Sequence, residues 1–310
     1  MNSIGIPVLS TRQKLSVCFK MKKKFLALGI GTAMMLSLLS GCGGDTSAES
    51  SGSGSGSGGG TSGEASYTIK LAYTPGNMDA EDSPDIMFGD VFKEYVEENS
   101  NGQIKVELYP SGQLGTAEET LQGVISGTVE LSVIDASLLG NIYEPVQALS
   151  TPGLFSSTDQ ANEVIQGEWG QSFMNDIGEN VNVKLLGMHC KGMRCFTNNV
   201  RELRTPSDAA GITFRVMENT VSIRMVEAMD AIATPMSGSE MYSALETGVV
   251  DGQENPVINI VQDLTYEVQK YLTLDEHMAG FMAYIMNVDF YNNLPDDLKA
   301  VVDEGAAQAT

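Results

Sequence analysis

The chain has 310 residues, of which 40 are acidic and 18 are basic, and its formal net charge is −22 at pH 7. Residues 1–41 contain six of the basic residues and none of the acidic ones, so the rest of the chain has a formal net charge of −28. This charge argues against nucleic acid or an anionic lipid surface as partner, and it makes any arginine in a cleft worth explaining.

Residues 21–41 are typical of a bacterial lipoprotein signal peptide. Three lysines follow Met21, and Phe25 to Leu39 form an uncharged apolar run. The run is shorter than the about 20 residues that a membrane-spanning helix needs, but it suits the core of a signal peptide. It ends in Leu-Ser-Gly-Cys42, which resembles a lipobox, where the peptide is cut before the cysteine and the sulfur takes a diacylglycerol. We therefore predict an extracytoplasmic protein with a lipid anchor on Cys42; an ordinary signal peptide that contains a cysteine is the alternative.

Two further segments lie outside the expected folded body. We interpret residues 1–20 as an upstream extension, with the true start at Met21. Residues 42–65 consist mainly of Gly, Ser, Thr and Ala, which bury too little apolar surface to fold, so they predict a flexible stalk. The residues that follow the stalk are numerous enough for two α/β lobes.

The first part of the folded body alternates between strand and helix patterns. Five elements are predicted, in the order strand, helix, strand, helix, strand: Tyr67–Tyr73, Asp85–Asn99, Gln103–Tyr109, Thr116–Ser126 and Val129–Ile134. This βαβαβ order predicts a parallel sheet with right-handed crossovers. In the first helix Met87, Val91, Phe92, Tyr95 and Val96 lie on one side.

The second part of the body continues in the same manner. It predicts helices at Gln160–Ile177, Asn219–Met229, Tyr266–Tyr271 and from Leu294 to Ala309, and strands at Val183–Gly187, Gly211–Met217 and Phe281–Asn287. In the second of these strands Ile212, Phe214 and Val216 share one face, and Arg215 lies on the other.

The stretch from Ser237 to Pro256 predicts a binding site. Ser237 and Glu240 have the spacing of a capping box, Met241, Ala244 and Leu245 share a helical face, and Gly248 is a helix stop. Val249 and Val250 predict a short buried strand. The polar residues Gln253, Glu254 and Asn255 then follow a strand end, where open α/β sheets usually bind ligands.

Enzyme motifs are absent from the sequence, so we predict neither a catalytic residue nor a cofactor. His189 and His277 lack an evident nucleophile and are interpreted as structural. Cys190 and Cys195 lack the further ligands of a zinc site, and no metal is predicted. A disulfide between them and a pair of buried thiols both remain open.

The order of several motifs resembles that of the solute-binding proteins of TRAP (tripartite ATP-independent periplasmic) transporters, of the dicarboxylate-binding DctP type. The resemblance runs from Tyr67 to Thr310. It rests on these segments: Tyr-Pro-Ser-Gly-Gln-Leu-Gly115; Gly-x-x-Arg194 before Thr-Asn198; Gly211-x-x-x-Arg215-Val-Met-Glu-Asn219; Glu240-x-Tyr-x-Ala-Leu-x-x-Gly-Val-Val-Asp-Gly-Gln-Glu-Asn-Pro256; and Tyr266-Glu-Val-Gln-Lys-Tyr-Leu272.

The resemblance implies a two-lobed α/β periplasmic-binding-protein fold that closes on its ligand by hinge motion. We expect lobe I to comprise residues 66–192 and 281–310, and lobe II residues 193–280. The implied partners are a small organic acid and the small and large TRAP membrane subunits, which use an ion gradient.

The resemblance also implies roles for individual residues. Arg215 matches the family's signature arginine, whose guanidinium makes a two-pronged salt bridge to the ligand carboxylate. Arg194 and Asn255 match further carboxylate contacts. The remaining implied positions are Asp135 as a pocket acceptor or a strand-end cap, Thr74 and Asn77 in a cleft-lining loop, and Gln253, Glu254, Glu240 and Tyr242 as supporting residues.

Two departures from the family pattern affect these expectations. Many relatives have an aromatic residue at the position of Gly238, so the pocket wall is expected to be open here. Relatives also continue beyond the position of Thr310, which implies that the chain is truncated and leaves Leu298, Val301 and Val302 poorly covered. The alternative functions are a ligand-sensing surface lipoprotein that signals through a receptor and, less favoured, an exported enzyme.

Overall fold

The computed structural model of the chain describes residues 65–73 and 83–310. The predicted extension, signal peptide, stalk and lipidation site at Cys42 lie outside the described residues, as do Thr74 and Asn77. No described helix is long and apolar enough to cross a membrane. The described residues belong to one compact unit, Gly59–Thr310.

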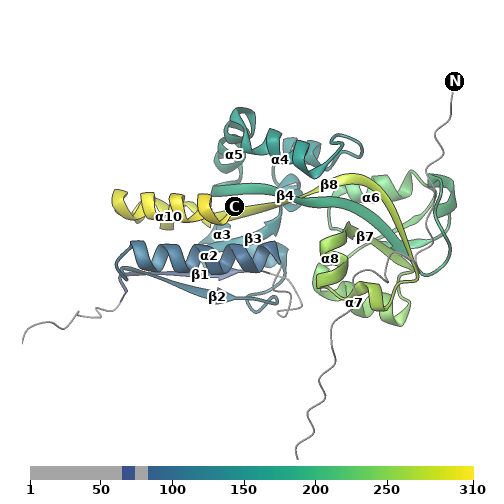
Figure 1. The fold of residues 1–310 in the computed structure, drawn as a ribbon, viewed down its shortest axis with the longest axis horizontal. Coiled ribbons are helices and arrows are strands. Elements are labelled where there is room, and N and C mark those ends of the chain that lie inside the picture. Colours follow the sequence, from purple (N-terminus) through teal and green to yellow (C-terminus); the bar gives the residue numbers. More distant parts are fainter. Residues whose placement is uncertain (1–64, 74–82) are drawn as a thin grey trace, which may run out of the picture. The chain divides into compact units, whose positions relative to one another are not determined.

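Eight strands form a single mixed sheet in the order β2-β1-β3-β8-β4-β7-β5-β6 (Figure 1). β1 (Tyr67–Ala72) pairs in parallel with β2 (Ile104–Tyr109) and with β3 (Leu131–Asp135). Two helices, α2 (Pro84–Asn99) and α3 (Ala117–Ser126), connect these strands. The predicted parallel βαβαβ unit is therefore confirmed for these three strands.

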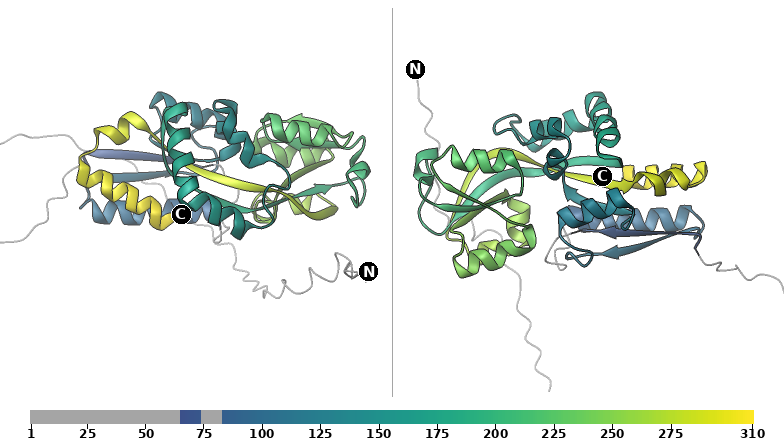
Figure 2. Two further views of the ribbon diagram at one scale, coloured as in Figure 1. Left: turned by 90° about the horizontal axis from the view of Figure 1, so that it is seen from above. Right: turned by 180° about the vertical axis from the view of Figure 1, so that it is seen from behind.

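Two long antiparallel strands run through the middle of the sheet, β4 (Val183–Asn198) and β8 (Tyr271–Asn287). Figures 1 and 2 show them extending from the group that contains α2, α5 and α10 into the group that contains α6, α7 and α8. The sequence predicted only one end of each strand, and the helix predicted at Tyr266–Tyr271 is wrong. A single 3₁₀ turn, η4 (Thr265–Glu267), stands there before β8 begins.

The other end of the sheet contains three short strands, β5 (Thr213–Val216), β6 (Ile232–Pro235) and β7 (Gly252–Pro256). β5 pairs in parallel with β6 and β7, whereas β7 is antiparallel to β4. The helices of this part are α6 (Thr220–Glu227), α7 (Gly238–Thr247) and α8 (Val257–Gln262).

The buried apolar residues form separate clusters in the two groups of elements. Two large clusters lie on the β1–β3 side, one around Leu121, Leu139 and Ile177 and one around Phe92, Tyr284 and Val302. Smaller clusters form around Phe214 and around Met241. The clusters agree with two lobes, while the exact lobe boundaries at residues 192 and 280 stay a prediction.

Helices α4 (Thr158–Gln166), α5 (Glu168–Val181), α9 (Val288–Asn293) and α10 (Asp296–Ala309) complete the first group, together with the 3₁₀ helices η1 (Ala136–Asn141) and η2 (Glu144–Ser150). A further 3₁₀ turn, η3 (Pro206–Ala209), precedes β5. α10 packs against α2, where Leu298 is 2% and Val302 0% exposed. The expectation of poor cover is wrong for these two residues, and Val301 is half-buried.

Within α2, the predicted apolar face is shifted. Phe92 and Val96 are buried, and Tyr95 is partly buried. Met87 and Val91, on the same predicted side, are exposed, while Phe88 faces the core. The two cysteines, Cys190 and Cys195, are free, buried thiols.

The predicted helix after Ser237 is confirmed as α7, and Gly248 ends it in a left-handed conformation with φ of 74°. Ser237 is its N-cap, but no capping box forms, because the Ser237 hydroxyl lies 3.0 Å from the Glu240 carboxylate and donates to it. The strand predicted at Val249 and Val250 is wrong: Val249 is 65% exposed and lies in the bend that precedes β7.

Candidate functional site

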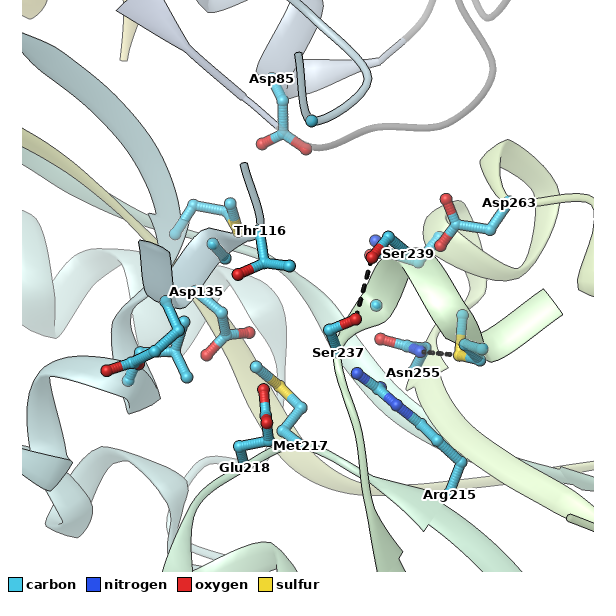
Figure 3. Close-up of a pocket in the computed structure, with 18 of the residues that line it drawn as sticks. Asp85, Thr116, Asp135, Arg215, Met217, Glu218, Ser237, Ser239, Asn255 and Asp263 are labelled. Atoms are coloured by element: carbon cyan, nitrogen blue, oxygen red, sulfur yellow. Dashed lines mark hydrogen bonds between the residues drawn. The ribbon is translucent and has the colours of Figure 1, made fainter. Parts of the chain in front are cut away.

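A cavity of about 380 Å³ is lined by residues from both groups of elements (Figure 3). Its walls come from the start of α2, the loop before α3, the end of β3, β4, β5, the start of α7, β7 and α8. Gln253, Glu254 and Asn255 were predicted in a loop, but they lie inside β7, and of the three only Asn255 lines the cavity. The strand was missed because its sequence is wholly polar until Pro256.

Arg215 lies on β5, in register with Gln253 of β7, and its side chain faces this cavity. It is 4% exposed, and its Nε and Nη2 atoms donate to the Met236 carbonyl oxygen at 3.1 and 2.8 Å. No carboxylate of the described residues forms an ion pair with it. Burial lowers the pKa of Arg215 to about 10, so the guanidinium stays charged at neutral pH. The result is a buried cation without a counter-ion from this part of the chain.

Arg194 lines the same cavity from β4 but is already paired. Its Nε atom lies 2.5 Å from Glu254 Oε2, and its Nη2 atom donates to Glu254 Oε1 at 2.9 Å and to the Glu254 carbonyl at 2.8 Å. Arg194 is 2% and Glu254 0% exposed. Glu254 thus holds Arg194 in place through this ion pair. The prediction that Glu254 shapes a loop is wrong, because Glu254 lies in strand β7.

His277 completes this buried group on the side of Glu254. Its Nδ1 atom lies 2.9 Å from Asp275 Oδ2 and its Nε2 atom 3.4 Å from Glu254 Oε2, while its ring stacks on Phe196. Burial alone would raise the pKa of Glu254, but Arg194 and His277 lower it to about 2. Glu254 is therefore ionised throughout the neutral range and is fully committed to its two partners.

A third cation of the cavity wall, Lys191, was not predicted from the sequence. Its Nζ atom lies 3.3 Å from Asp85 Oδ2, and both side chains are almost completely buried. The second oxygen, Asp85 Oδ1, is buried without a hydrogen-bond partner among the described residues. Lys191 lies within a long strand and Asp85 in the first turn of a helix. No local sequence pattern indicates that these two residues pair.

Asp135 is a strand-end cap that also lines the cavity, and its role as an acceptor of ligand hydrogen bonds stays a prediction. It caps η1, with Oδ1 accepting from the Ser137 amide at 3.0 Å, and it lines the cavity with Oδ2 3.6 Å from Arg194 Nη1.

Asn255 is 7% exposed and lines the cavity from β7. Its Nδ2 atom donates to Gln253 Oε1 at 2.6 Å and lies 3.5 Å from the Met241 sulfur. Glu240 and Tyr242 do not line the cavity. Gly238 does, and a Cβ atom there would lie 3.9 Å from Arg215 Nη2, so the missing side chain leaves space beside this guanidinium.

Three cations of the described residues line the cavity, and two of them are neutralised by buried carboxylates: Lys191 by Asp85 and Arg194 by Glu254. Of these three, only Arg215 has no ion pair with a carboxylate in the described part of the chain. No cluster of His, Cys, Asp and Glu side chains in the described part of the chain could hold a metal ion.

A two-part α/β body with a polar cavity that contains a buried arginine is the arrangement of an extracytoplasmic solute-binding protein. Residues 76–310 match the family model of the bacterial extracellular solute-binding proteins, family 7, the DctP family. The chain belongs to this family of TRAP solute-binding proteins. The family acts outside the cytoplasm and its members are not enzymes, so both of these sequence-based predictions are confirmed.

The relatives and solved structures agree with this assignment. A solute-binding protein of Verminephrobacter eiseniae is 33% identical over 215 residues, which cover 69% of this chain and 64% of that protein. A TRAP periplasmic solute-binding protein of a Polaromonas species, solved with bound D-erythronate, superposes with a TM-score of 0.74 at 30% identity, covering 79% of each chain. One from Sulfurospirillum deleyianum, solved with succinate, gives a TM-score of 0.73 at 31% identity, covering 79% of this chain and 78% of that one.

Proposed function

We propose that the body captures a small organic acid by a two-pronged salt bridge between the ligand carboxylate and Arg215. The observation that carries this proposal is the burial of Arg215 in the cavity wall without an ion pair to a described residue. A buried cation is costly unless a counter-charge meets it, and a carboxylate matches the planar fork of a guanidinium. The bond to the Met236 carbonyl holds the side chain until the ligand replaces it.

The charges of the cavity favour a ligand with one carboxylate and several hydroxyl groups. Because Asp85 and Glu254 neutralise the other two cations, a second carboxylate would face Asp135, Glu118 and Glu218 without a free positive partner among residues 65–73 and 83–310. Hydroxyl groups can instead donate to these carboxylate oxygens and to Asp85 Oδ1, which has no hydrogen-bond partner in the described part of the chain. A sugar acid such as the D-erythronate bound by the Polaromonas relative therefore suits this cavity better than succinate.

In this proposal a lipid on Cys42 anchors the protein, the segment 42–65 is the stalk, and the loaded body delivers its ligand to a TRAP permease. Family membership supports import over signalling through a receptor. Thr74 and Asn77 stay predicted contacts of the ligand, as do the secondary contacts from Arg194 and Asp135.

Isothermal titration calorimetry with D-erythronate and succinate tests the proposal. We expect Arg215→Ala to weaken erythronate binding at least about a hundredfold, because two charge-assisted hydrogen bonds of about 1.5–3 kcal/mol each are lost. Arg215→Lys should give an intermediate affinity, since an ammonium keeps the charge without the fork.

Arg224→Ala is the matched control. Arg224 is an exposed arginine of α6 that pairs with Glu227, so its loss removes the same charge away from the cavity. Equal affinities of Arg215→Ala and Arg224→Ala for every acid tested would contradict the proposal.

A further inference from the structure

A second, much smaller cavity shares part of its wall with the candidate site. Its volume is about 10 Å³, and Asp135, Arg194 and Met217 line both cavities. Figure 3 shows Asp135 and Met217 on the same side of the larger cavity. The rest of the smaller cavity's wall comes from η1, η2, α6 and β8 and includes three serines. A polar cavity of this size has room for one water molecule and for no larger ligand.

The hydroxyl group of Ser222 is the reason to expect a water there. Ser222 lies in the first turn of α6, is 0% exposed and lines the second cavity. Its amide donates to Asn219 Oδ1 at 2.8 Å, but its Oγ atom has no hydrogen-bond partner among residues 65–73 and 83–310. A buried hydroxyl group without a partner costs free energy, and a water that bonds to it removes this cost.

Two charged groups of the same wall supply the further partners of a buried water, which usually has about three. The Nε and Nη2 atoms of Arg194 are bonded to Glu254, so the N–H groups of Nη1 are those that can donate to a water. Nη1 lies 3.6 Å from Asp135 Oδ2, which is too far for a direct hydrogen bond. A water beside these atoms can accept from Arg194, donate to Asp135 and bond to Ser222 as its third partner.

Direct hydrogen bonds already join the two groups of elements beside this cavity. Asn141 of η1 donates through Nδ2 to the Glu218 carbonyl at 2.7 Å, and Asn219 Nδ2 donates to Ser137 Oγ at 3.3 Å. Both bonds connect η1, in the group that contains α2, with the turn before α6, in the other group. A water between the end of β3 and the first turn of α6 connects the same two groups.

We propose that the second cavity binds one water molecule, which bridges Ser222 to Asp135 and Arg194 and stabilises the arrangement in which the two groups of elements meet. Hinge motion that separates the groups breaks this bridge. Ser222 is therefore a positioning residue that touches no ligand, and its contribution to affinity is the same for every ligand. The effect on affinity rests on the proposed function, whereas the water site does not.

A crystal structure of the protein with D-erythronate tests for the water. We expect a water about 2.6–3.2 Å from Ser222 Oγ and equally close to Asp135 Oδ2 or Arg194 Nη1. A structure without this water, or one in which the Ser222 hydroxyl bonds to a protein group, would overturn the inference.

Ser222→Ala tests the bridge by the sign of its effect on affinity. With the water in place the variant loses one neutral hydrogen bond, and calorimetry should show every acid that binds weakened by the same factor of about five. In a dry cavity the variant would instead remove a buried hydroxyl group without a partner, and binding would become tighter. Ser243→Ala is the control, because it makes the same substitution at an exposed position of a helix, α7, and should leave the affinities unchanged.

The outcomes separate this inference from the proposed function. Unchanged or tighter binding in Ser222→Ala, or a weakening confined to one acid, would overturn the bridge and leave the role of Arg215 intact. Failure of the unaltered protein to bind any acid would overturn the proposed function. The crystal structure of the ligand-free protein then decides on the water by the same distances.

Discussion

At the scale of single residues, the two buried arginines of the cavity differ in their partners. Arg194 has a bidentate ion pair with Glu254, and Arg215 has only a backbone carbonyl. Removing one member of a buried pair leaves the other charge uncompensated, whereas removing an unpaired buried charge relieves a desolvation cost. The same substitution should therefore have opposite effects at the two positions.

We predict that Arg194→Met lowers the free energy of unfolding of the ligand-free protein by about 3–5 kcal/mol. Arg215→Met should leave it unchanged or raise it, although it abolishes ligand binding. Urea denaturation of both variants without ligand measures the difference. A larger loss of stability in Arg215→Met than in Arg194→Met would contradict this assignment, because it would mean that Arg215 has the stabilising ion pair.

The two histidines should respond to pH in opposite directions. Burial opposes protonation of His277, but Asp275 and Glu254 outweigh it and raise its pKa above the ordinary 6.5. Burial lowers the pKa of His189, which shares a hydrogen bond of 2.8 Å with the Tyr284 hydroxyl. A raised pKa in the folded state contributes stability that is complete below pH 6.5 and is lost as the pH rises through the folded value.

We accordingly predict that the free energy of unfolding falls as the pH rises above 6.5 and through the raised pKa of His277, and that His277→Gln reduces this fall. His189→Gln is the control, because the contribution of His189 is already complete above its unfolded pKa of 6.5 and is lost only toward acid. Denaturation curves across this pH range give the slopes. Identical slopes in the unaltered protein and in His277→Gln would contradict the prediction.

At the scale of elements, α10 is part of the core of the first group. Leu298 and Val302 pack with Phe92 and Val96 of α2, and a Cβ atom on Gly305 would lie 2.8 Å from Val96 Cγ2. The two helices therefore approach closely over a small residue, and their contact is sensitive to side-chain volume.

We predict that Leu298→Ala lowers the free energy of unfolding by about 2–5 kcal/mol, the usual range for a buried leucine. Gln308→Ala, at an exposed position of the same helix, should change it by less than about 0.5 kcal/mol. Thermal or urea unfolding distinguishes the two. Similar small losses in both variants would mean that α10 is not held in the core.

Elements with a periodic apolar pattern could be predicted from the sequence. The βαβαβ unit was found because Ile69, Leu71, Ile104 and Val106 alternate with polar residues, and α7 because Gly248 marks its end. β7 was missed since Gln253, Glu254 and Asn255 are polar and buried, and only their tertiary partners stabilise them there. The full length of β4 was missed for the same reason at Lys191 and Arg194.

The site was predictable to a similar degree. Arg215, Asn255 and Asp135 were found and do line one cavity, because strand periodicity and motif order are local properties of the chain. The sequence could not predict that Arg194 is ion-paired and Arg215 is not. The partner of Arg194 is Glu254, which lies sixty residues away in sequence. The Lys191–Asp85 pair joins positions 106 residues apart and has no local signal at all.

At the scale of the whole molecule, an acidic protein is proposed to bind an anion. The formal net charge of −22 repels anionic ligands at a distance, so the attraction must come from a local, buried cation that solvent and salt screen only weakly. Of the three cavity cations in the described part of the chain, two are ion-paired internally and one is not, and we propose that this matches the site to a single ligand charge. This match is the central claim of the account.

A crystal structure of the body with D-erythronate tests that claim most directly. We predict that both carboxylate oxygens lie about 2.7–2.9 Å from guanidinium nitrogens of Arg215, which leaves the Met236 carbonyl, while Arg194 stays on Glu254 and Lys191 on Asp85. A carboxylate bound to Lys191 or Arg194, with Arg215 still on Met236, would contradict it.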